Sequence, residues 1–125
     1  MLLGNLHRIT QSGTEAFHRN VPGDLDVTVR QTMVMAMLEE NDGVSQTAIV
    51  NATGIDRSTL ADIVRRLTKR GWLTRRRTKE DARAYSVKVT PEGKKALRTA
   101  LSAMSKTEKD LLARFPALKH LQNGS

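Results

Sequence analysis

The stretch from Asp56 to Thr90, DRSTLADIVRRLTKRGWLTRRRTKEDARAYSVKVT, changes its hydrophobic period halfway along. In its first part the apolar side chains recur at the spacing of a helix that buries one face, at Leu60, Ile63, Val64 and Leu67. Further on the period falls to two, which predicts strands over Leu73–Arg77 and Ala84–Val89. The stretch therefore predicts an amphipathic helix that ends at Gly71, followed by a hairpin whose tip is Thr78–Arg83.

A second, shorter helix is expected directly before this stretch. Ser45 can cap a helix over residues 46–52, and Ala48 and Ile49 are expected to point inward from it. Thr53-Gly54-Ile55 then forms a tight break, and Asp56 caps the next helix. Two short helices joined by a glycine-containing turn, the second amphipathic with a polar outer face, are the helix-turn-helix pattern.

Three longer helices are expected on the two sides of this pattern. A mostly apolar helix precedes it over Val27–Glu40, and near-helical spacing indicates a first helix over Leu2–Phe17. Thr90 and Pro91 supply an N-cap and a first-turn proline for a long last helix, which Pro116 ends or kinks. Its expected apolar stripe contains Leu97, Ala100, Leu101, Met104, Leu111, Leu112 and Phe115, interrupted by Glu108. The 125 residues thus predict one mainly α-helical domain, residues 1–125, with a small β-hairpin.

The positive charge is concentrated in one segment. The chain has a net charge of +8, and residues 57–83 hold ten basic and three acidic side chains, or +7 of that total. Such a segment is typical of proteins that bind a polyanion. Cysteine is absent, which excludes disulfides, thiolate chemistry and sulfur-ligated metal sites, and the sequence has no apolar run long enough to span a membrane. A cytoplasmic protein that needs no cofactor or metal is expected.

The basic segment supplies two groups of candidate DNA-binding residues. On the second helix of the pattern they are Ser58, Thr59, Asp62, Arg65, Arg66 and Lys69; on the hairpin they are Arg75, Arg76, Arg77, Lys79 and Arg83. Arginine can donate two hydrogen bonds to guanine, serine and threonine can meet phosphates or bases, and Asp62 can orient the two arginines that follow it. A charged solvent face explains the helix alone equally well. The basic hairpin beside it favours the DNA interface.

This region resembles the MarR-type transcriptional regulators. The likeness covers residues 25–97 and is carried by Gln31, by Ile55-Asp56-Arg57-Ser58-Thr59, by Gly71-Trp72-Leu73-Thr74-Arg75, by Asp81-Ala82-Arg83-Ala84, and by Val87-Lys88-Val89-Thr90-Pro91-Glu92-Gly93. The family's wing has two arginines after its aspartate. Ala82 replaces the first, so only Arg83 carries over as the minor-groove residue, and any role of the first passes to Lys79 or is lost.

The resemblance implies a winged helix-turn-helix over residues 27–90, flanked by dimerisation helices at 1–20 and 91–122 that are shorter than those of most members. It implies a homodimeric regulator, most often a repressor, that binds a pseudo-palindromic DNA duplex. Such regulators often release DNA when a small, frequently aromatic anion enters the crevice between the two parts; no residue is assigned to that effector here. The thiol-oxidation switch of some relatives is excluded, because the chain has no cysteine.

The sequence also bears on two other classes of function. A winged helix can also bind RNA or a protein partner, and salt-sensitive binding without sequence preference would favour that alternative. An enzyme is disfavoured, because His7, His18 and His120 lie far apart in the sequence and Glu39-Glu40 is expected to be an exposed pair at a helix end.

Overall fold

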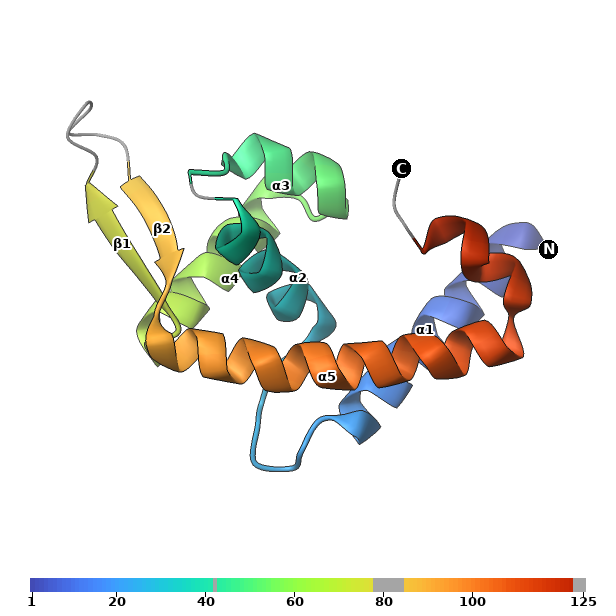
Figure 1. Cartoon of the computed structure of the whole chain (residues 1–125). Helices are drawn as coiled ribbons and strands as arrows, with labels where there is room; N and C mark the ends of the chain where they lie inside the picture. Colours follow the sequence, from blue (N-terminus) through green and yellow to red (C-terminus); the bar gives the residue numbers. More distant parts are fainter. Residues whose placement is uncertain (42, 78–84, 123–125) are drawn as a thin grey trace. The chain divides into compact units, whose positions relative to one another are not determined.

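The computed structural model of the chain describes residues 1–41, 43–77 and 85–122 (Figure 1). It is mainly helical and has one two-stranded antiparallel sheet, as the sequence predicted. In chain order its elements are α1 (Leu2–Asn20), α2 (Val29–Glu40), α3 (Gln46–Thr53), α4 (Arg57–Arg70), β1 (Leu73–Arg77), β2 (Tyr85–Val89), α5 (Pro91–Arg114) and a 3-10 helix (Pro116–Leu121). The chain divides into a central unit, Arg30–Arg98, and a terminal unit made of Met1–Val29 and Thr99–Ser125.

Helix α4 has the boundaries and the buried face that its sequence predicts. Asp56 caps its first turn by accepting a hydrogen bond from the backbone N–H of Thr59, and Gly71 ends it in the left-handed conformation, with φ of 89°. That φ suits glycine because a Cβ atom would be strained there. The four residues expected on the inner face, Leu60, Ile63, Val64 and Leu67, are all buried.

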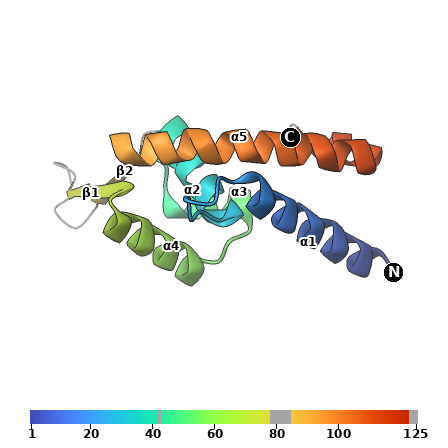
Figure 2. The same ribbon diagram turned by 90° about the horizontal axis from the view of Figure 1, so that it is seen from below.

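The hairpin leaves the C-terminal end of α4 (Figure 2). Leu73 pairs with Val89 and Arg75 with Val87, so the strands run antiparallel without a bulge over five residue pairs. Leu73 and Val89, at the base, are both buried. The predicted tip, with Lys79 and Arg83, and the predicted first residue of the second strand, Ala84, lie outside the described residues.

A small hydrogen-bonded junction, which we call the Thr90 junction, joins α4, the hairpin and α5. The Thr90 N–H donates to the Trp72 carbonyl oxygen at 3.0 Å, and the Thr90 hydroxyl donates to the Gly71 carbonyl oxygen at 2.6 Å. The same hydroxyl oxygen accepts the Gly93 N–H at 3.0 Å and so caps α5. At Gly93 the two backbones lie so close that a Cβ atom would stand 2.2 Å from the Trp72 carbonyl oxygen. The junction therefore requires both the threonine and the glycine.

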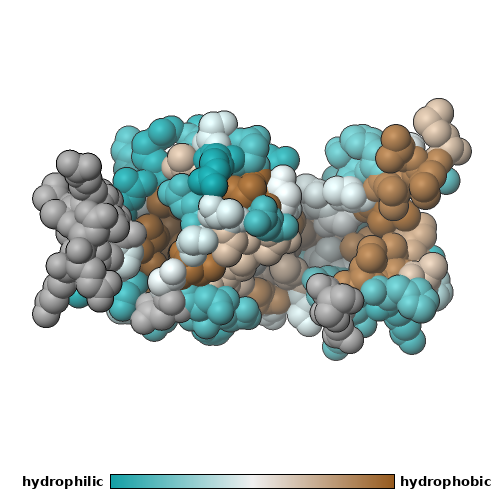
Figure 3. Space-filling view, turned by 90° about the horizontal axis from the view of Figure 1, so that it is seen from above, coloured by the Kyte–Doolittle hydropathy of each residue, from teal (hydrophilic) through white to brown (hydrophobic). Residues whose placement is uncertain are grey.

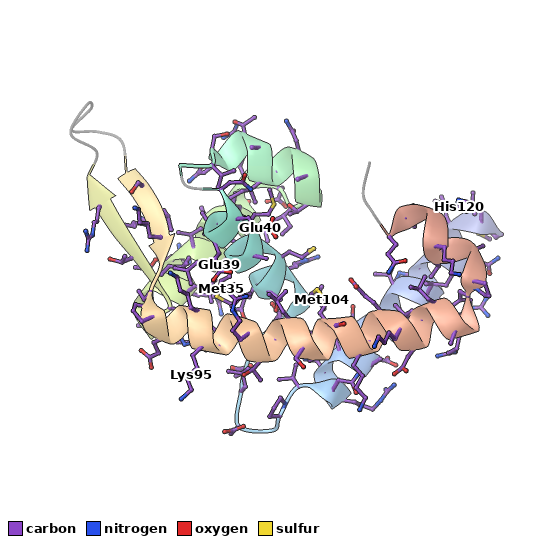
Figure 4. The ribbon with its side chains drawn as sticks, viewed as in Figure 1. Met35, Glu39, Glu40, Lys95, Met104 and His120 are labelled. Carbon is purple, nitrogen blue, oxygen red and sulfur yellow. The ribbon has the colours of Figure 1, made fainter. Side chains whose placement is uncertain are left out.

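Helix α2 contributes further buried side chains to the central unit. Thr32, Val34, Met35 and Leu38 of this helix are buried. Glu39 lies in the last turn of α2 (Figure 4). Its carboxylate accepts a hydrogen bond from the guanidinium of Arg98 in α5. The Glu39 side chain is only 21% exposed, so the expected exposed Glu39-Glu40 pair is wrong for Glu39.

Two further expectations from the sequence are corrected by the structure. Helix α2 begins at Val29, two residues later than expected; Val27 is instead buried in the non-helical segment before it. Ala48 is exposed, whereas its neighbour Ile49 is buried at 2% exposure. Helix α3 has only eight residues, so its buried face is narrow, and Ile49 is the residue on that face.

In the terminal unit, Phe17 near the end of α1 and Val21 directly after that helix are buried, as are Ala100, Ala103 and Thr107 from the second part of α5. The side chains of Asn20 and Thr107 connect the two helices, with the amide donating to the hydroxyl at 2.9 Å. The larger apolar residues expected in the α5 stripe, from Leu101 to Phe115, are only half-buried. As the sequence indicated, α5 stops just before Pro116.

Replacing Gly93 with alanine is expected to destabilise the fold. The added Cβ would collide with the backbone of Trp72, so the free energy of unfolding should fall by about 1–3 kcal/mol, as for other overpacked sites. Urea denaturation followed by circular dichroism measures the change. Gly23→Ala is the matched control, because a Cβ at Gly23 meets nothing within 4 Å. Equal stabilities of the two variants would contradict the close approach at the junction.

Candidate nucleic-acid interface

The outer face of α4 carries the polar residues that the sequence selected. Ser58, Arg65, Arg66 and Lys69 are exposed, whereas Thr59 and Asp62 are half-buried. The opposite face holds the apolar residues that pack inside the central unit. The six candidates therefore lie away from the apolar face of α4, and the four exposed ones are accessible to a large ligand.

Asp62 holds both arginines of this face. Its Oδ2 atom accepts from Nε of Arg66 at 2.8 Å, and its Oδ1 atom accepts from Nη2 of Arg65. Both arginine side chains are about 70% exposed, so the pairs contribute little to stability. Each guanidinium has five N–H donors and uses one of them in its hydrogen bond to Asp62. Enough donors remain for a two-bond contact with a base or a phosphate, from side chains whose direction is set in advance.

The first turn of α4 is organised around Asp56. Its Oδ1 atom accepts from the Thr59 N–H at 2.7 Å and from the Ser58 hydroxyl at 2.9 Å, and its Oδ2 atom accepts from the Thr59 hydroxyl at 3.0 Å. The backbone bond from Thr59 and the two hydroxyl bonds lower the pKa of Asp56 below its usual value. The side chain is therefore a carboxylate at neutral pH.

The junction of α3 and α4 holds a pair that the sequence did not predict. The Arg57 Nη2 atom donates to the Thr47 hydroxyl oxygen at 2.5 Å, across ten residues of sequence. Both side chains are exposed and lie next to the first turn of α4. Arg57 was visible as part of the basic segment, but no periodic pattern links it to Thr47. The pair adds a cation and a hydroxyl to the candidate interface.

The hairpin places further arginines beyond the end of α4. Arg75 and Arg76 of β1 are both exposed although neighbouring strand residues point to opposite faces, so both faces of this strand present a cation. Arg77 continues β1, opposite Tyr85. Arg70 is different, because its guanidinium stacks on the buried Trp72 ring, 4.5 Å from the ring centre. It therefore helps to cover the core at the end of α4.

Residues 1–41, 43–77 and 85–122 contain no group of three histidine, aspartate or glutamate side chains placed to hold a metal ion. Among the same residues, no helix has the length and apolar composition needed to cross a membrane. The arginine-rich surface of α4 and β1 is the feature of the central unit that points to a ligand.

The chain is similar in sequence to known transcriptional regulators. Residues 25–84 match the model of the MarR family. The transcriptional regulator HosA of Escherichia coli O127:H6 is 29% identical over 112 residues, which are 90% of this chain and 81% of that protein.

Solved structures extend the likeness to nearly the whole chain. The PcaV transcriptional regulator of Streptomyces coelicolor is 26% identical, with a TM-score of 0.77 over 96% of this chain and 87% of that one. A second structure of PcaV contains its natural ligand. The transcriptional repressor CouR, bound to a 23-mer DNA duplex, is 25% identical, with a TM-score of 0.77 over 98% of this chain and 82% of that one.

Replacing Asp62 with asparagine is expected to lower discrimination between DNA sequences. The variant loses the charge that orients Arg65 and Arg66, so these side chains should lose contacts to a particular base while keeping their attraction for any phosphate. The ratio of affinities for a preferred and a scrambled duplex should fall about tenfold, within the range for one lost base contact. Fluorescence anisotropy measures both affinities.

Glu15→Gln is the control for this prediction, because it removes one negative charge from an exposed position of α1. It should leave the affinity ratio unchanged. If Asp62→Asn and Glu15→Gln give the same ratio, Asp62 affects only the net charge.

Proposed function

Because the chain belongs to the MarR family, we propose that it is a transcriptional regulator that binds double-stranded DNA as a homodimer and acts as a repressor. One observation carries this proposal: α4 turns its apolar side to the core and holds two arginines on its outer side, next to a strand that exposes two more. A helix of this kind can lie in the major groove while a basic hairpin follows the sugar-phosphate backbone.

Each part of the surface then has its own role. Arg65 and Arg66, steered by Asp62, contact guanine O6 and N7 in the major groove, and Lys69 meets a phosphate farther along the helix. Arg75, Arg76 and Arg77 contact phosphates along the hairpin. Lys79 and Arg83 remain proposed on sequence grounds, with Arg83 in the minor groove.

The dimer is supported by apolar side chains in the terminal unit. Figure 3 shows hydrophobic residues gathered where α1 begins and the 3-10 helix ends. The exposed large ones are Met1, Leu2, Leu3, Leu6 and Leu121. A cluster of this kind usually marks an interface, and a second copy of the chain can cover it. A two-fold dimer places its two α4 helices on half-sites about one helical turn apart.

Regulation by a small molecule is part of the same proposal. PcaV, which shares the fold over nearly its whole length, has a natural ligand, and we propose that this chain also releases DNA when it binds an effector. We further propose that the chain is not an enzyme, because the family that it belongs to consists of transcriptional regulators.

A binding selection tests the proposed function directly. The purified chain is offered a randomised duplex library and single-stranded RNA of equal length over a salt series, and the bound duplexes are sequenced. We expect an inverted repeat whose half-sites are separated by about ten base pairs. Equal, steeply salt-dependent binding to every nucleic acid would instead support a winged helix that binds RNA or a protein partner.

Introducing a charge into the exposed apolar cluster is expected to break the dimer. Leu6→Glu would bury an unpaired carboxylate at the interface, so the dimer dissociation constant should rise about tenfold or more. Sedimentation velocity over a concentration series measures it. Gln11→Glu, at another exposed position of α1, is the control and should leave the dimer intact. An unchanged dimer in Leu6→Glu would place the interface elsewhere.

A further inference from the structure

We infer that Ser58 and Thr59 act as hydrogen-bond acceptors that read the amino group of an adenine or a cytosine in the major groove, and that Asp56 gives them this polarity. The inference rests on the proposed function and deepens it, because it assigns two residues of the interface to a class of base. The sequence had left open whether these hydroxyls meet phosphates or bases.

The argument starts from the single hydrogen atom of a hydroxyl group. A serine or threonine hydroxyl can donate one hydrogen bond and accept two. Ser58 donates its hydrogen to Asp56 Oδ1 at 2.9 Å, and Thr59 donates its hydrogen to Asp56 Oδ2 at 3.0 Å. Both hydroxyls are thereby committed as donors. Toward DNA they can offer only lone pairs.

This polarity selects among the groups that DNA presents. Phosphate oxygens are acceptors, and so are guanine O6 and N7, adenine N7 and thymine O4, so none of these can donate to the two hydroxyls. The donors in the major groove are the N6 amino group of adenine and the N4 amino group of cytosine. The Asp56 carboxylate, which lies against both hydroxyls, also repels a phosphate.

A neighbouring pair has the opposite polarity and can take the phosphate instead. The Thr47 oxygen accepts from Arg57, so the Thr47 hydroxyl hydrogen can point outward as a donor, and Arg57 keeps four further N–H donors. These groups suit the oxygens of a backbone phosphate. The junction of α3 and α4 therefore has donors for the backbone beside acceptors for a base edge.

Capping alone does not explain the arrangement around Asp56. One hydrogen bond, from the Thr59 N–H to the carboxylate, satisfies the cap. The bonds from the Ser58 and Thr59 hydroxyls are additional, and the exposed Ser58 hydroxyl has no need of its bond because water can pair with it equally well.

The experiment uses the full chain and the duplex selected above. At each adenine of a half-site, purine replaces the base and removes only the N6 amino group; at each cytosine, 2-pyrimidinone removes the N4 amino group. For the parent chain we expect one position where this change weakens binding about tenfold. In the variant with Ser58→Ala and Thr59→Val the same change should have less than a twofold effect, because the acceptors are gone.

Two further variants complete the test. Asp56→Asn keeps a cap oxygen but no longer binds both hydroxyls as a carboxylate does, so guanine or thymine should become tolerated at that position. Ser102→Ala, in an exposed part of α5, is the control and should keep the full sensitivity to the analogues. Circular dichroism confirms that each variant is folded.

The failure of this inference and the failure of the proposed function give different results. The inference is wrong, and the proposed regulator is still supported, in either of two cases. In the first, an inverted repeat is selected but the removal of no amino group weakens binding. In the second, the removal weakens binding equally for the parent chain and for the variant without the two hydroxyls. If no sequence is selected at all, the proposed function itself fails.

Discussion

The Thr90 junction is the contact on which the geometry of the proposed interface depends. One threonine binds the carbonyl oxygens of Gly71 and Trp72, which end α4, and caps α5 through Gly93. The helix that would enter the major groove and the hairpin that would follow the backbone are thus tied at their common corner. At Gly93 the Trp72 carbonyl oxygen occupies the space that a side chain would take, so α5 packs directly on the backbone at the base of the hairpin. Moving α4 and the hairpin apart would break the hydrogen bonds of Thr90.

Stability and recognition are assigned to different residues of the central unit. Leu60, Leu67, Leu73 and Leu97 are almost completely buried, and burial of such side chains contributes about 1.5–3 kcal/mol each. The ion pairs of Asp62 lie on the surface, where a pair contributes about 0–1 kcal/mol. The polar face of α4 can therefore be changed in a regulator of different specificity at little cost to the fold.

The sequence was sufficient for the features that depend on local periodicity. The four buried residues of α4, its glycine end and the two strands of the hairpin all follow from spacing along the chain. Spacing could not show the bond between Arg57 and Thr47 or the pair of Glu39 with Arg98, because those partners lie ten and 59 residues apart. Nor could it show where the hydroxyl hydrogens of the α4 first turn point, which depends on side-chain rotamers. Ala48 was misplaced because a helix of eight residues gives too few positions to fix its inner face.

Asp56 and Asp62 place two negative charges on a surface that would meet a polyanion, and these charges affect both the affinity for DNA and the discrimination between DNA sequences. Each carboxylate lowers the attraction of the surface for phosphate, which all DNA sequences share. In return, each fixes the hydrogen-bonding direction of two neighbours, the hydroxyls of Ser58 and Thr59 in one case and the guanidinium groups of Arg65 and Arg66 in the other. The weaker attraction for phosphate lowers the affinity for every duplex, whereas the directed hydrogen bonds raise the affinity only for a duplex with matching base edges. Because specificity is a difference between affinities, acidic residues at these two positions would increase discrimination in the proposed DNA complex even where they weaken binding.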